Sequence, residues 1–162
     1  MAADRFDWLR RIKAVEREHA ATQFATDQLL ATAELDPNVL QGDLALRDLR
    51  RASEGLEGTY LIRLFAEFET GLRLFWEEVR RTDPPTRTRD LLDGIAATWR
   101  IPHEQLHDAH AVREYRNSLV HARREATERV AIPQARGHLC RFFAFLPLSR
   151  SSLFTSHGEG VK

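Results

Sequence analysis

A permanent cation, a carboxamide and an imidazole stand close together in the stretch Arg116-Asn117-Ser118-Leu119-Val120-His121. On a helix this stretch would span about one and a half turns. A guanidinium grips phosphate oxygens through a planar fork of donors, and an imidazole takes up or releases a proton near neutral pH. We therefore expect phosphate chemistry here, with His121 as the acid or base, Arg116 as the phosphate ligand and Asn117 orienting the groups around it.

Asn117 makes the pattern more specific than an arginine and a histidine alone. In a chain this rich in arginine, with 7 histidines, chance supplies roughly one Arg-x4-His pair. Asn38 and Asn117 are the only asparagines, so the fuller pattern Arg-Asn-x3-His arises by chance in roughly one of a hundred such chains.

Helix geometry separates the groups of this pattern. At about 100° per residue, Asn117 and His121 lie about 40° apart, whereas Arg116 and His121 lie about 140° apart. Arg116 then projects on the apolar side of its helix, where a cation needs an acceptor. Glu69 borders the apolar face of another expected helix and could be that acceptor. Two hypotheses stay open: an Arg116–Glu69 pair that only joins two helices, or a site that Arg116 completes around its helix or across a subunit interface.

A row of polar residues shares the helix of this pattern. Its members fall within about 80° of one another on a helical wheel: His103, His107, His110, Glu114, Asn117 and His121. Histidines on adjacent turns could bind zinc, although one helix supplies only two ligands well. The other interpretations are a solvated polar face and a supporting role for His110 and Glu114 beside His121. We expect no metal and no cofactor.

Composition limits the classes of function. The net charge is +0, so any binding of nucleic acid must depend on a local patch. Lys13 and Lys162 are the only lysines among 24 basic residues, which reflects either a GC-rich genome or phosphate recognition by arginine. Cys140 is the single cysteine, and we see neither a secretory signal nor a membrane span, so we expect a cytoplasmic protein without membrane contact.

Apolar residues at helical spacing predict an all-α, up-and-down bundle of about five to six helices. Residues 1–148 are expected to form one helical domain and residues 149–162 a flexible tail. Gly55 and Gly58 are expected to end the second helix and to separate it from the third, which carries the hydrophobic centre. The expected helices cover about 4–33, 40–54, 59–81, 89–99, 103–124 and 133–146, with 128–132 extended before Pro133.

Three stretches resemble one known family. Arg116-Asn117-x3-His121 is similar to the signature of the HEPN superfamily (higher eukaryotes and prokaryotes nucleotide-binding domains), an Arg-x(4 to 6)-His motif in which a polar residue follows the arginine. The segment 60–73 resembles the apolar helix with an embedded acid that precedes the motif in many members. Residues 129–133 and 139–147 resemble a closing helix of bacterial members, so the resemblance covers roughly residues 40–148.

The resemblance implies a helical dimer in which two motifs face one cleft. Catalytic members are metal-independent endoribonucleases, often toxins or defence proteins, which would make His121 the general acid or base, Arg116 the phosphate ligand and Asn117 the orienting residue. It further implies RNA as partner, and an antitoxin or regulatory protein as another. Members paired with nucleotidyltransferase antitoxins commonly carry Tyr two residues after the histidine, and here Arg123 occupies that position. Non-catalytic members bind nucleotides or proteins, and a helical interaction module stays open as the alternative.

Overall fold

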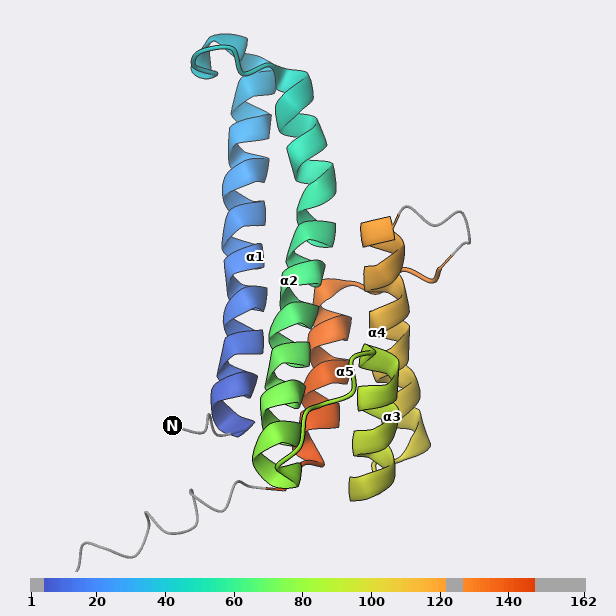
Figure 1. Cartoon of the computed structure of the whole chain (residues 1–162). Helices are drawn as coiled ribbons and strands as arrows, with labels where there is room; N and C mark the ends of the chain where they lie inside the picture. The colour runs from blue at the N-terminus through green and yellow to red at the C-terminus, as the bar shows by residue number, and fades with distance from the viewer. Residues whose placement is uncertain (1–4, 122–126, 148–162) are drawn as a thin grey trace, which may run out of the picture.

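The protein is all-helical in the computed structural model, which describes residues 5–121 and 127–147. Within these ranges there are five α helices, one short 3-10 helix and no strand, which confirms the all-α expectation (Figure 1). The elements are α1 (Arg5–Leu35), η1 (Pro37–Val39), α2 (Leu46–Arg80), α3 (Thr88–Trp99), α4 (His103–His121) and α5 (Ile132–Ala144). None of the described helices combines the length and the apolar character that crossing a bilayer requires.

The two long helices α1 and α2 form an antiparallel hairpin whose far half extends beyond the other helices (Figure 1). Trp8, Ile12 and Val15 of α1 are buried against the body of the bundle. Phe24, further along the same helix, is 68% exposed. The reason is tertiary: in the described part of the chain, no third α helix covers the outer half of the hairpin (Figure 1).

Gly55 and Gly58 do not end a helix, so the prediction of one helix before them and another after them was wrong. Both glycines lie inside the single helix α2. A glycine inside a helix costs about 1 kcal/mol relative to alanine. Burial of an aliphatic side chain returns about 1.5–3 kcal/mol, and α2 buries Leu49 before the glycines and Leu61 and Leu64 after them. Packing along both sides of the pair therefore outweighs the local helix-breaking preference.

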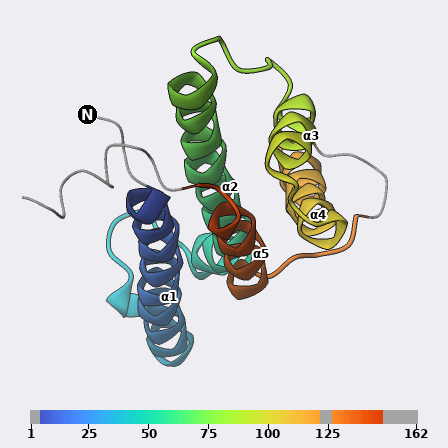
Figure 2. The same ribbon diagram turned by 90° about the horizontal axis from the view of Figure 1, so that it is seen from below.

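Helix α5 fills the centre of the bundle, where it packs against α1, α2 and α4 (Figure 2). Pro133 lies in its first turn, which matches the expectation, although the helix ends at Ala144 and does not reach Leu146. Phe68 of α2 meets Phe142 and Phe143 of α5 edge to face, with ring centroids 5.7 and 5.1 Å apart. This geometry suits the quadrupoles of aromatic rings.

Gly71 allows three helices to meet at one point. A Cβ atom at this position would lie 2.8 Å from Cδ2 of Trp8 and 2.8 Å from Cζ of Phe143. Neither ring has room to retreat in a close-packed core. The glycine therefore permits the contact between α1, α2 and α5.

The connection from α2 to α3 is anchored by side chains of α2. Arg73 donates from Nη1 to the carbonyl of Pro85 at 2.8 Å and from Nη2 to that of Thr86 at 3.1 Å. Glu69 accepts a hydrogen bond from Thr88 Oγ1 at 2.8 Å. These contacts hold α3 beside the bundle, and α3 in turn packs on α4.

The expected tail 149–162 and the expected last turn of the motif helix, at 122–124, lie outside the described residues.

Candidate functional site

Arg116 of α4 is half-buried and lies against α2. Its guanidinium carbon is 5.8 Å from the centroid of the Phe65 ring, within cation–π range. Its Nη1 donates to Oδ1 of Asn117 at 2.9 Å. Its Nε is buried without a hydrogen-bond partner among the residues that the structure describes. Such an arrangement is costly for a cation, because no carboxylate in the described ranges offsets its loss of water.

Glu69 is not the acceptor of Arg116. One of its oxygens accepts from Nε and Nη2 of Arg73, at 3.1 and 2.7 Å, and from Thr88. The hypothesis of an Arg116–Glu69 pair that only joins two helices is therefore wrong. Arg73 outcompetes Arg116 because it lies one turn from Glu69 on the same helix.

His121 lies in the last turn of α4 and is exposed. The helix separates it from Arg116 by about 140° around the axis. Asn117 projects between the two and holds the guanidinium through its amide oxygen. Within one chain, then, the motif places its cation against α2 and its imidazole on the outer surface of α4.

His110 and Glu114 belong to a polar network between α3 and α4. Nδ1 of His110 accepts from Nε of Arg113 at 3.3 Å, so Nε2 carries the proton that is donated to Oδ1 of Asp93 at 2.8 Å. Glu114 accepts from Arg113 at 3.1 Å and is exposed. The structure thus links both residues to Arg113 and not to His121.

The other histidines of this row do not converge on a metal site. The rings of His103 and His107 stack with centroids 6.4 Å apart near the start of α4. No group of three or more histidine, cysteine, aspartate or glutamate side chains gathers around a metal-sized point in the described part of the chain. The zinc hypothesis therefore finds no converging ligand set there.

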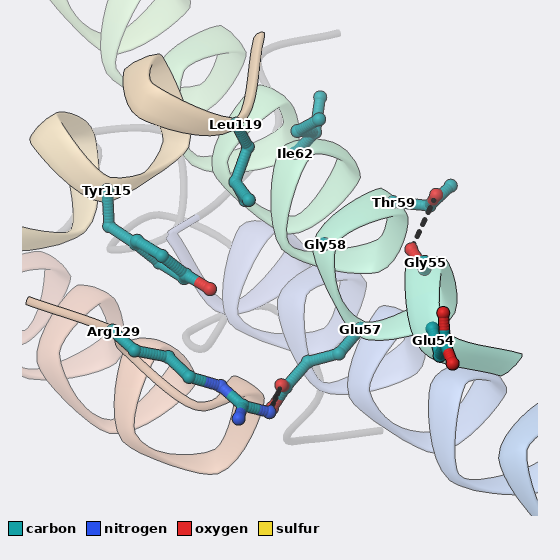
Figure 3. A pocket seen from close by; sticks show the side chains of 9 residues that line it. All are labelled: Glu54, Gly55, Glu57, Gly58, Thr59, Ile62, Tyr115, Leu119 and Arg129. Atoms are coloured by element: carbon teal, nitrogen blue, oxygen red, sulfur yellow. Dashed lines mark hydrogen bonds and ion pairs between the residues drawn. The ribbon is translucent and has the colours of Figure 1, made fainter. Parts of the chain in front are cut away.

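A hollow opens between α2, the second half of α4 and the segment that leads into α5 (Figure 3). Its volume is about 440 Å³, within the range of small-molecule sites. Its lining residues are Glu54, Gly55, Glu57, Gly58, Thr59, Ile62, Tyr115, Leu119 and Arg129. Tyr115 directly precedes Arg116, so the hollow and the motif share one stretch of α4.

The polar end of the hollow is an ion pair between Arg129 and Glu57, which Figure 3 shows reaching across from α2 to the segment before α5. The hydrogen bond and negative charge of Glu57 raise the pKa of the Arg129 guanidinium, with smaller contributions from Tyr115. Glu57 also accepts from the backbone N–H of Ile132 at 3.4 Å. These contacts fix the start of α5 against α2.

The hollow was not anticipated from the sequence. The one signal was the pair Gly55 and Gly58, which was interpreted as a helix break. Leu119 of α4 lies over Gly58, with its Cδ2 3.5 Å from the site a Cβ would occupy. A Cβ on Gly55 would meet nothing within 4 Å. Glycines three residues apart on one helix face can thus indicate a surface that another group approaches closely.

Comparisons with protein-family models, with curated proteins and with solved structures found no match for this chain.

Proposed function

We propose that this protein is a metal-independent endoribonuclease whose active site is built on Arg116, Asn117 and His121. The observation that carries the proposal is the state of Arg116: a half-buried guanidinium without a carboxylate partner among the described residues, oriented by Asn117. A structural arginine in such a place is normally neutralised. A cation left without its counter-charge suits an anionic substrate, and phosphate is the anion whose geometry a guanidinium fork matches. A toxin or defence role would fit the family resemblance of the motif.

RNA carries its own nucleophile, so this chemistry needs no metal. The ribose 2′-OH attacks the adjacent phosphorus while a base removes its proton, and the P–O5′ bond breaks. The products are a 2′,3′-cyclic phosphate and a 5′-OH, whose oxygen takes up a proton. His121 would transfer one of these protons, and Arg116 would stabilise the charge that grows on the non-bridging oxygens. DNA lacks the 2′-OH and should not be cleaved.

The angle between Arg116 and His121 favours a cleft shared by two copies of the chain. In this proposal the arginine of one copy and the histidine of the other act on the same phosphate. Mixing Arg116→Ala protein with His121→Ala protein tests this sharing, because mixed dimers would contain one intact site. Recovery of partial cleavage on mixing is the expected result, and no recovery would place both residues of a site in one chain.

The primary experiment is incubation of the purified protein with mixed single-stranded RNA, with and without EDTA. We expect cleavage that EDTA does not inhibit and products ending in 2′,3′-cyclic phosphate. His121→Ala and Arg116→Ala should each abolish it while circular dichroism shows the fold intact. His107→Ala is the matched control, since His107 is an exposed histidine at the other end of α4. Cleavage that persists in both motif variants would refute the proposal.

A non-catalytic binding module is the second candidate, and it is favoured by the separation of Arg116 from His121 within one chain. Such a module would retain RNA in a gel-shift assay without forming product. Its binding would depend on Arg116 and not on His121. The two candidates therefore differ in the effect of His121→Ala on RNA binding and turnover.

A further inference from the structure

We propose that the hollow between α2 and α4 binds a nucleobase of the RNA, and that it prefers guanine. The inference rests on the proposed function, because it assigns the hollow to the same substrate that Arg116 holds. It is carried by the floor, the walls and the polar groups of the hollow.

The floor is bare helix backbone. Gly55 and Gly58 keep side chains off this face of α2, and Gly55 faces open space. Alanine there would favour the helix and meet no neighbour, so packing within the described chain does not require glycine at position 55. A glycine there leaves the backbone open to close approach by a ligand.

The walls suit a flat ring. The aromatic ring of Tyr115 and the aliphatic side chain of Leu119 reach from α4 toward α2 (Figure 3), and Ile62 of α2 also lines the hollow. An aromatic side chain can stack on any nucleobase, and such stacking is the main source of affinity for unpaired RNA. A volume of about 440 Å³ is sufficient for a purine and its ribose.

The polar groups favour guanine over the other bases. Glu54 at the rim is an exposed carboxylate for which no partner is found in the described ranges. A carboxylate only accepts hydrogen bonds, and its two oxygens match two adjacent N–H donors. Guanine offers such a pair at N1 and N2, whereas the other bases present at most one donor group beside an acceptor at that edge. Arg129 adds donors of the kind that read guanine O6 and N7.

The hollow lies beside the stretch of α4 that carries Arg116. Along α4, Arg116 directly follows Tyr115 of the wall. Along α2, Phe65 beneath the guanidinium lies one turn after Ile62 of the wall. Arg116 is not one of the lining residues, so the sugar and phosphate of a base seated over the glycines would have to extend out of the hollow to reach it.

The test uses 5′-GMP and 5′-AMP with the His121→Ala protein, which cannot turn over RNA under the proposed function. Titration is followed through the methyl NMR signals of Leu119 and Ile62. We expect GMP to shift both signals and to bind at least tenfold more tightly than AMP. Gly55→Leu, which fills the floor, and Glu54→Gln, which removes the charge of the carboxylate, should each weaken GMP binding at least tenfold.

Two matched variants control for nonspecific effects. Ala97→Leu adds the same side chain at an exposed site on α3, and Glu104→Gln removes an exposed carboxylate at the far end of α4. Both should bind GMP as the parent protein does. Equal binding of GMP and AMP would overturn the guanine preference, and absence of any methyl shift would overturn the base site. Shifts produced by N-acetyl-phenylalanine amide but not by GMP would also overturn it, and would identify a groove for a protein side chain.

The outcome for the hollow is separable from that for catalysis. Cleavage of RNA without preference for guanine, together with methyl signals that GMP does not shift, would refute the base site and support the ribonuclease. GMP binding without any RNA cleavage would keep the base site and reduce the proposed function to binding.

Discussion

Glu69 accepts two hydrogen bonds from Arg73, one turn further along α2, at 3.1 and 2.7 Å. The same carboxylate oxygen accepts from Thr88, and Arg73 holds two carbonyls of the connection to α3. Glu69 is thus occupied in fixing α3, and among residues 5–121 and 127–147 no carboxylate pairs with Arg116.

Glu69→Ala should therefore lower stability and spare activity. Loss of a half-buried carboxylate that accepts several hydrogen bonds should reduce the free energy of unfolding by about 1–3 kcal/mol, measured by urea denaturation. Glu104→Ala, at an exposed site, is the control. RNA cleavage per folded molecule should stay at the parent level. Loss of cleavage with unchanged stability would instead place Glu69 in the site.

Arg116→Met should have the opposite pattern. Methionine keeps an apolar stem over Phe65 and removes a half-buried charge, so the free energy of unfolding should stay the same or rise. RNA cleavage and RNA binding should be lost. Thermal unfolding and a cleavage assay on one preparation give both values. A fall of more than about 2 kcal/mol would show that Arg116 has a structural role.

Substitution by alanine at Gly55 and at Gly71, both inside α2, should change the free energy of unfolding in opposite directions. Gly55→Ala meets no neighbouring atom and should raise stability by up to about 1 kcal/mol. Gly71→Ala forces a methyl group to within 2.8 Å of Trp8 and Phe143 and should lower it by about 1–3 kcal/mol. Urea denaturation of the two variants side by side tests the prediction. Equal shifts would contradict the close approach at Gly71.

Cys140 should react slowly while the protein is folded. Burial raises the pKa of its thiol, and the nearby charges of Arg136 and Lys13 lower it by less. Fewer thiolates then form at pH 8 than on an unfolded chain. Labelling with a disulfide reagent should accelerate markedly in urea, and equal rates would refute the prediction.

The same shift has a consequence for stability at alkaline pH. Because the thiol ionises at lower pH in the unfolded chain, the unfolded state loses its proton first. Stability should therefore decline as pH rises above the ordinary thiol range. Cys140→Ala should show a smaller decline across that range when both proteins are unfolded with urea at a series of pH values.

The sequence by itself indicated four of the five described α helices and most of their ends, but it divided α2 into two. Apolar residues at helical spacing indicated α1, α3, α4 and α5, and Pro133 marked the first turn of α5, because these signals depend on local sterics and periodicity. It also determined that Arg116 and His121 lie on different sides of one helix, since that follows from the angle per residue alone.

Only the tertiary structure decided what the neighbours of those residues are. Whether Gly55 and Gly58 end a helix depends on how deeply the leucines on either side are buried. That stabilisation comes from residues other than the glycines. Whether Glu69 pairs with Arg116 or with Arg73 depends on which guanidinium lies nearer. The hollow exists because Tyr115, Glu57 and Arg129, from three separate segments, meet over a glycine surface, and sequence spacing carries no information about that convergence.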